Sequence, residues 1–121
     1  MSTISDFNSL SVDLITQLSM LCPRSIIAIN SDIIIKMIKN DPNKLIDIFT
    51  LHILKYKPQI DSGDDNFFIN NSFSSEVENN TDMINKIFEF KSIWKQLNQQ
   101  NRDFVKQYMQ YLCQLALAYI S

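Results

Sequence analysis

The chain has little of what turns and β-sheets require. Its 121 residues contain one glycine and three prolines. A β-sandwich or β-barrel of this length would need many turns built from these two residue types. Their scarcity favours helices, and a chain of this length is expected to form one domain around one hydrophobic core.

Long apolar runs and targeting signals are lacking as well. The most apolar stretch, residues 111–120, is interrupted by Gln114 and is shorter than the roughly 20 residues that a membrane span needs. The first ten residues are polar and do not resemble a signal peptide. We therefore expect a protein without a membrane span that is not secreted.

Cysteine is rare, so the chain can form at most one disulfide bond within itself. Cys22 and Cys113 are the two cysteines of the chain, and both lie among apolar residues. This setting predicts buried free thiols in a reducing compartment. A disulfide between the two residues remains the alternative interpretation.

The net charge is small, at -2. Residues 1–60 carry six basic and five acidic side chains, whereas residues 61–121 carry five basic and eight acidic ones. Residues 61–82 contain no lysine or arginine. This balance argues against a general attraction to nucleic acid or to anionic membranes, although the lysine-rich first half keeps a nucleic-acid-associated role open as an alternative.

Apolar spacing predicts helices throughout the first half. One apolar stripe, with steps of three or four residues, predicts a helix over 5–22 that Ser5 or Asp6 caps and Pro23 ends. The stripe consists of Phe7, Leu10, Leu14, Leu18 and Leu21.

Two further helices are expected before residue 58. Residues 31–40 predict a helix with Ser31 as its N-cap, whereas 25–30 fit a helix and irregular structure equally well. The pair Asp41-Pro42 predicts the start of a third helix, and Pro58 predicts its end.

Residues 58–82 are rich in Asp, Asn and Ser and contain the one glycine. A segment of this length and composition predicts a long acidic loop with a functional role. The aromatic pair Phe67 and Phe68 indicates that part of the loop packs against the rest of the chain, and a short helical turn fits residues 66–72.

The last third predicts two helices back to back. The first covers 82–97 with Thr81 as its cap and Trp94 in the core, and the second covers 99–120 with Asn98 as its cap. The face that we expect the second helix to bury consists of Phe104, Tyr108, Tyr111 or Leu112, Leu115 and Tyr119. Its apolar surface is wider than one partner helix can cover, which is typical of an interface.

Together these patterns predict an all-α fold, a compact bundle of four to six helices with a long acidic central loop. Residues 1–121 would form a single helical domain, with N-terminal helices in 1–57, the loop in 58–82 and a C-terminal helical pair in 83–121.

Reactive side chains do not gather in the sequence. His52 is the one histidine and lies far from both cysteines, whereas a zinc site needs four ligands, or three and a water. The acidic run 61–65 lacks the spacing of a calcium-binding loop. A glycine-flanked nucleophile and a phosphate loop are both missing from the sequence. We expect no enzyme activity, no catalytic residues, no metal and no cofactor.

Residues 90–112, with the stretch Phe90-Lys91-Ser92-Ile93-Trp94 followed by a capped helix, resemble a known group of proteins. The segment is similar to small helical proteins encoded by the nucleocytoplasmic large DNA viruses, or giant viruses. Their acidic-aromatic segment is matched here by residues 64–68, whereas Phe104-Val105 departs from their Ile-Trp. No activity is assigned to that family, so the resemblance carries over no site residue.

The resemblance implies a virus-encoded protein in the host cytoplasm, at the viral factory, or in the virion. We expect a non-enzymatic structural or assembly protein that acts through helical protein–protein interfaces, as a homo- or hetero-oligomer. An adaptor for a host or viral regulatory protein is the first alternative, and a nucleic-acid-associated factor is the second. The candidate partner-binding residues are Phe67, Phe68, Tyr111 and Tyr119, because exposed aromatic side chains anchor many interfaces.

Overall fold

The structure, a computed structural model, describes residues 2–70 and 91–121. Within these ranges every regular element is a helix, which confirms the predicted all-α class. The four longest are α1 (Thr3–Leu21), α3 (Ser31–Asn40), α4 (Lys44–His52) and α9 (Gln99–Ile120). The shorter ones are α2 (Ile26–Ile29), the 3-10 helix η1 (Leu54–Tyr56), α5 (Lys57–Ser62), α6 (Asp65–Asn70) and α8 (Lys91–Trp94).

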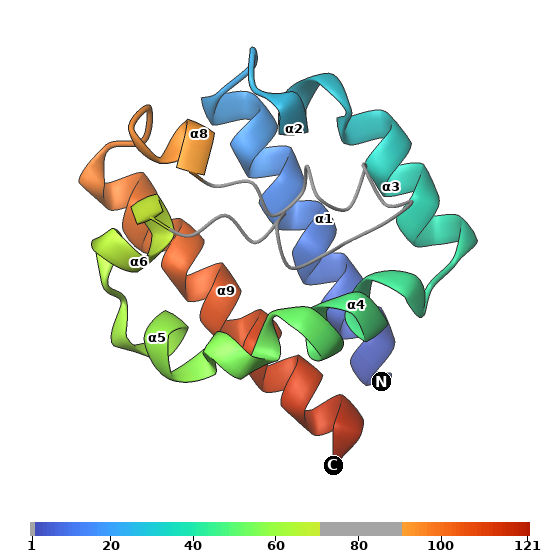
Figure 1. The fold of residues 1–121 in the computed structure, drawn as a ribbon. Helices are drawn as coiled ribbons and strands as arrows, with labels where there is room; N and C mark the ends of the chain where they lie inside the picture. The colour runs from blue at the N-terminus through green and yellow to red at the C-terminus, as the bar shows by residue number, and fades with distance from the viewer. Residues whose placement is uncertain (1, 71–90) are drawn as a thin grey trace.

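Helices α1 and α9 form the centre of the fold. They lie side by side and run in opposite directions, so that both chain termini lie at the same end of the molecule (Figure 1). Helices α2 and α3 pack against α1, α5 packs against α9, and α4 contacts both central helices. The shorter helices therefore pack around the α1/α9 pair, with α3 beside α1 and α5 beside α9 (Figure 1).

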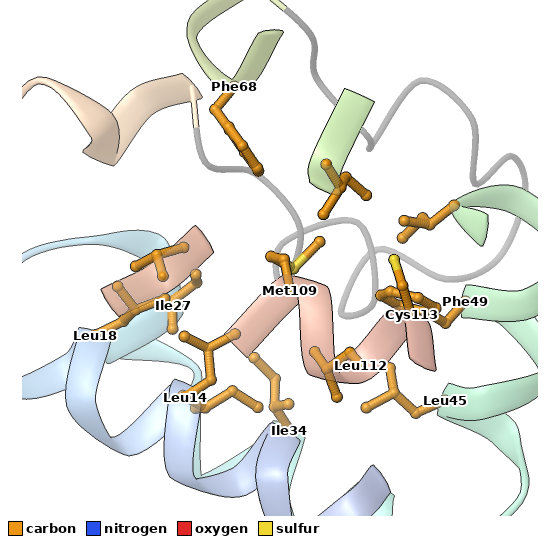
Figure 2. Packing of buried hydrophobic residues seen from close by; sticks show 14 of the residues in the cluster. Leu14, Leu18, Ile27, Ile34, Leu45, Phe49, Phe68, Met109, Leu112 and Cys113 are labelled. Carbon is orange, nitrogen blue, oxygen red and sulfur yellow. The ribbon is translucent and has the colours of Figure 1, made fainter. Parts of the chain in front are cut away.

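The core fills the space between the central pair and the covering helices. Leu14 and Leu18 of α1 point towards Met109 and Leu112 of α9, with Ile34 of α3 beside them (Figure 2). Phe7 and Phe49 join α1 to α4 through an edge-to-face contact with ring centroids 5.2 Å apart. Each of these fully buried apolar side chains contributes roughly 1.5–3 kcal/mol, so the packing of α1, α3, α4 and α9 around one core stabilises the fold.

Both central helices begin at a side-chain cap. The Asn98 side chain accepts a hydrogen bond from the Asn101 backbone N–H at 2.8 Å, which confirms Asn98 as the predicted cap of α9. The cap predicted for the first helix, Ser5 or Asp6, is wrong. Ser2 accepts from the Ser5 N–H at 3.3 Å, and because this earlier acceptor is present, α1 begins at Thr3.

The predicted helix over 31–40 is confirmed as α3, but its predicted cap is wrong. Ser31 donates its hydroxyl hydrogen to the Ala28 carbonyl at 3.0 Å, because a helical turn already precedes it. That turn is α2, in which Ser25 accepts from the Ala28 N–H at 3.2 Å. The structure therefore resolves the open choice for residues 25–30 as a short helix.

The helix boundaries predicted at two prolines are wrong. The Asp41 N–H donates to the Met37 carbonyl at 3.0 Å, so Asp41 closes α3, and α4 begins only at Lys44. Pro42 instead offers its carbonyl to the Asn8 amide at 2.8 Å. Pro58 was expected to end the helix that begins after Asp41, but α4 already ends at His52. Pro58 lies instead in the first turn of α5, where its missing N–H costs nothing.

The first half of the predicted acidic loop is also helical, so the loop assignment is wrong for 58–70. Gly63 separates α5 from α6 with a left-handed φ of 68°, a conformation that glycine adopts without strain. Helix α6 contains the described part of the helical turn that we expected over 66–72. The remaining loop residues, 71–82, lie outside the described residues.

The predicted helix over 82–97 is described from residue 91 onward, and its start at 82–90 lies outside the described residues. The helix ends at Trp94 as α8, earlier than expected, because the N–H groups of Gln96 and Leu97 turn back to the carbonyls of Ile93 and Trp94. Trp94 is fully buried, as predicted, and stacks on Phe68 with ring centroids 4.9 Å apart.

Candidate protein-binding groove

Part of the aromatic side of α9 lies on the surface. The prediction that Phe104 is buried is therefore wrong, whereas of the two alternatives Tyr111 and Leu112 it is Leu112 that is buried. Phe104 is 48% exposed and Tyr111 is 56% exposed. The residues that α9 does bury are Val105, Met109, Leu112, Cys113 and Ala116. Most of these side chains are smaller than phenylalanine or tyrosine, which allows α1, α4 and α5 to approach α9 closely on that side.

One side of α9 carries a continuous row of exposed and half-buried apolar side chains, which we call the aromatic stripe. It consists of Phe104, Tyr108, Tyr111 and Leu115. Their spacing of four, three and four residues places them on one face of the helix. The rings of Phe104 and Tyr108 stack with centroids 5.4 Å apart and planes inclined by 19°, so the two side chains pack against each other along the helix.

A groove of about 420 Å³ runs between the aromatic stripe and α1. We call it the α1/α9 groove, and it is lined by Asp6, Leu10, Tyr111, Gln114 and Leu115. The antiparallel register of the two helices also brings Asp13 of α1 close to Tyr108. The pKa of Tyr108 is raised, first by burial and then by the negative charge of Asp13.

The groove is acidic. Helix α1 contains Asp6 and Asp13 and no basic residue, and residues 107–120 of α9 carry no charge. The two basic residues of α9 are engaged on another side, where Arg102 donates through Nε to the Trp94 carbonyl at 2.9 Å and Lys106 forms an ion pair with Asp65. No basic side chain of α1 or α9 therefore neutralises Asp6 in the groove or Asp13 beside Tyr108.

A larger hollow, of about 630 Å³, lies between α1 and α3. Hydroxyl and amide side chains make up much of its lining, including Ser2, Ser5, Asn8, Ser9 and Asn43. It contains no aromatic residue, and its apolar part comes from Ile4, Val12, Ile38 and Pro42. Interface anchors are enriched in aromatic side chains, so the smaller α1/α9 groove is the better candidate for binding a protein.

The four residues that the sequence predicted to bind a partner are placed very differently. Phe68 is 0% exposed and lies in the core against Trp94, and Phe67 is half-buried between Tyr56 and Phe68. Neither is a major part of the surface.

The two candidates on α9 also differ from each other. Tyr119 is half-buried, and its hydroxyl donates to Asp47 within the chain at 2.6 Å. Tyr111 is the one of the four whose side chain is mostly exposed, and it lines the groove.

Sequence reasoning missed four residues of the groove region: Asp6, Leu10, Asp13 and Phe104. The sequence did indicate that part of α9 is exposed, because its apolar residues cover too much of the helix circumference for all of them to be buried. Periodicity could not decide which side the neighbouring helices cover, because both candidate faces of α9 repeat at helical spacing.

The two cysteines are free and buried, as predicted. Burial raises the pKa of Cys113 to about 12 and also raises the pKa of Cys22. A thiol with a raised pKa carries little of the thiolate that reacts with oxidants and metals. The two cysteines therefore behave as core residues at neutral pH.

Two acidic residues of the run 61–65 take part in ion pairs. Asp61 pairs with Lys57 in α5, and Asp65 pairs with Lys106 in α9. In the part of the chain that the structure describes, no group of three His, Cys, Asp or Glu side chains could hold a metal ion. Across the same residues, none of the helices combines the length and the apolar character needed to cross a membrane.

The α1/α9 groove thus combines exposed aromatic rings, a hollow and unneutralised carboxylates. Side chains of this kind form contacts with another macromolecule, and the acidic lining favours a partner with basic side chains. Comparison of this chain with protein-family models, with curated proteins and with solved structures finds no match.

Proposed function

We propose that this chain is a non-enzymatic structural or assembly protein of a large DNA virus that binds another protein through the α1/α9 groove. The observation that carries the proposal is the exposure of Phe104 and Tyr111 beside a hollow between the two central helices. Aromatic rings held on a rigid helix lose little conformational freedom on binding and fill partner pockets well.

The site of action in this proposal is the host cytoplasm, at the viral factory, or the virion. Support for the viral origin comes from the sequence resemblance over residues 90–112. Part of that segment, residues 99–112, forms the first two-thirds of α9 and carries three members of the aromatic stripe. The proposed interface and the family resemblance therefore coincide in the same helix.

The experiment that tests this proposal is quantitative proteomics of purified virus particles, combined with affinity purification of the tagged protein. We expect the chain in particles at a fixed ratio to structural proteins, and we expect the double variant Phe104→Ser, Tyr111→Ser to be lost from them. The matched control is Leu51→Ser, which removes an exposed leucine from α4, away from the groove.

The alternatives give different results in the same experiment. Absence from particles, with recovery of one host or viral regulatory protein that depends on the groove, would favour the adaptor role. Salt-sensitive binding to DNA that survives the groove substitutions would favour a nucleic-acid-associated role.

A further inference from the structure

A second surface of the chain is complementary in character to the α1/α9 groove. It lies where α2 meets α3, and we call it the α2–α3 ridge. Ile29 is 72% exposed and Ile33 is 54% exposed. Helix α3 also carries the exposed lysines Lys36, one turn after Ile33, and Lys39, which lies at the edge of the α1/α3 hollow. The ridge is therefore aliphatic and basic, whereas the groove is aromatic and acidic.

The ridge is held rigidly from below. Ile27 of α2 and Ile34 and Ile38 of α3 are buried against the core, which fixes the opposite side of α3 towards solvent. Lys36 follows Ile33 by three residues, so the two lie on neighbouring positions of the same helix face. Exposed isoleucines on a fixed helix have already lost most of the freedom that binding would remove.

The charges around the ridge are mainly positive. Lys36 and Lys39 on α3, with Arg24 in the preceding turn, outnumber Asp32, the one acidic residue within α3. No ion pair joins either lysine to another residue in the described part of the chain. Asp6 lines the groove and is half-buried, and the exposed Asp13 lies close to Tyr108 of the stripe. Neither has a basic neighbour on α1 or on the facing part of α9, although Asp13 also lines the α1/α3 hollow together with Lys39.

We propose that the occupant of the α1/α9 groove is the α2–α3 ridge of a second copy of this chain. Ile29 and Ile33 of one copy would cover the aromatic stripe of the next, and Lys36 and Lys39 would lie close to Asp6 and Asp13. This inference rests on the proposed function, because it names the partner of the same groove. The contact joins two different surfaces, so it is heterologous and can propagate from copy to copy.

Reciprocal charge reversal tests this contact. The groove variant is Asp6→Lys, Asp13→Lys, and the ridge variant is Lys36→Asp, Lys39→Asp. In each variant the groove and the ridge carry the same sign, so each variant alone should self-associate at least about tenfold more weakly than the wild type. In a mixture, each groove meets a ridge of opposite sign on the other variant, so association should return.

The measurement is sedimentation velocity over micromolar to millimolar concentrations, at low and at high salt. We expect concentration-dependent association of the wild type that weakens with salt, loss of association in each variant and recovery in the equimolar mixture. Circular dichroism establishes that both variants remain folded. The double variant Ile29→Ser, Ile33→Ser keeps every charge of the chain and removes the apolar part of the contact. It should therefore also abolish association.

Three results would overturn the second-copy contact: a wild type that stays monomeric throughout, charge variants that associate like the wild type, or a mixture that fails to recover. If the wild type is monomeric while the groove substitutions still remove the protein from particles, the second-copy contact is wrong and the proposed function stands. If the wild type self-associates as predicted but is absent from particles, the contact stands and the proposed function is wrong.

Discussion

The Tyr119 hydroxyl donates a hydrogen bond to Asp47 Oδ1 at 2.6 Å, and this bond joins α9 near its C-terminus to α4 across 72 residues of sequence. The bond raises the pKa of Tyr119, because the neutral hydroxyl is the form that can donate. Tyr119, which the sequence predicted to contact another protein, therefore binds Asp47 of its own chain.

Replacing Tyr119 with phenylalanine should lower the melting temperature by a few degrees at neutral pH, because it removes this bond and leaves the ring. Tyr111→Phe is the matched control, since the Tyr111 ring lies on the surface and its hydroxyl forms no hydrogen bond in the described part of the chain. Because the pKa of Tyr119 is raised in the folded chain, the stabilisation by this bond depends on pH. It is fully present below the ordinary tyrosine pKa of about 10 and is lost as the pH rises through the pKa of the folded state. Equal melting temperatures for the two variants would contradict this role.

Removal of the Phe68 ring tests whether α6 belongs to the core. Phe68 is fully buried and stacks on Trp94 at 4.9 Å, so Phe68→Ala should lower the free energy of unfolding by about 3–5 kcal/mol. Urea denaturation followed by Trp94 fluorescence measures this loss. Phe68→Leu should cost markedly less, because it keeps most of the buried volume. A loss below about 1 kcal/mol for the alanine variant would mean that α6 is not packed as described.

Gly63 has a positive φ of 68°, which side chains of L-residues rarely adopt. A Cβ added there would meet the Lys106 side chain at 3.7 Å, an ordinary contact, so space does not limit substitution. Gly63→Ala should therefore lower the free energy of unfolding by about 1–2 kcal/mol through backbone strain. Gly63→Asn should cost less, because asparagine visits this region more readily. If both variants were as stable as the wild type, the left-handed turn between α5 and α6 would be absent.

The raised pKa of the buried Cys113 thiol should make the protein less stable at alkaline pH. Burial raises its pKa from 9.0 to about 12 in the folded chain, so between these values the unfolded state releases a proton that the folded state keeps. The free energy of unfolding should fall with rising pH across that window, by up to about 1.4 kcal/mol per pH unit. Cys113→Ala should flatten this dependence, as measured by urea denaturation at several alkaline pH values. An unchanged slope would show that the thiol is accessible to solvent in the folded chain.

Local signals predicted the secondary structure well where one interaction dominates. Asn98 has a side chain suited to capping and precedes a long periodic segment, and α9 begins and ends as expected. The pair Asp41-Pro42 offered an equally clear signal, yet the N–H of Asp41 closes α3 and the carbonyl of Pro42 binds Asn8. A residue 34 positions away decided that boundary, and local sequence carries no information about such a contact.

The candidate site was less accessible to sequence reasoning than the fold. Phe67 and Phe68 were expected to bind a partner because exposed aromatic side chains anchor many interfaces, but α6 turns Phe68 into the core. Phe104 was assigned to the core because it fits the helical period, but the neighbouring helices cover the adjacent face of α9. Which face is covered depends on how closely whole helices approach, and that follows from the packing of all of them together.

The most direct test of the account is site-specific photo-crosslinking at the groove. A benzoylphenylalanine residue replaces Phe104 in the aromatic stripe, and a matched protein carries it in place of Leu51, which is apolar and 72% exposed on α4. Irradiation in infected cells, the setting that the proposed function implies, should give a discrete protein adduct at position 104 and little or none at position 51. No adduct at position 104, or equal adducts at both positions, would contradict the assignment of the α1/α9 groove as the binding surface.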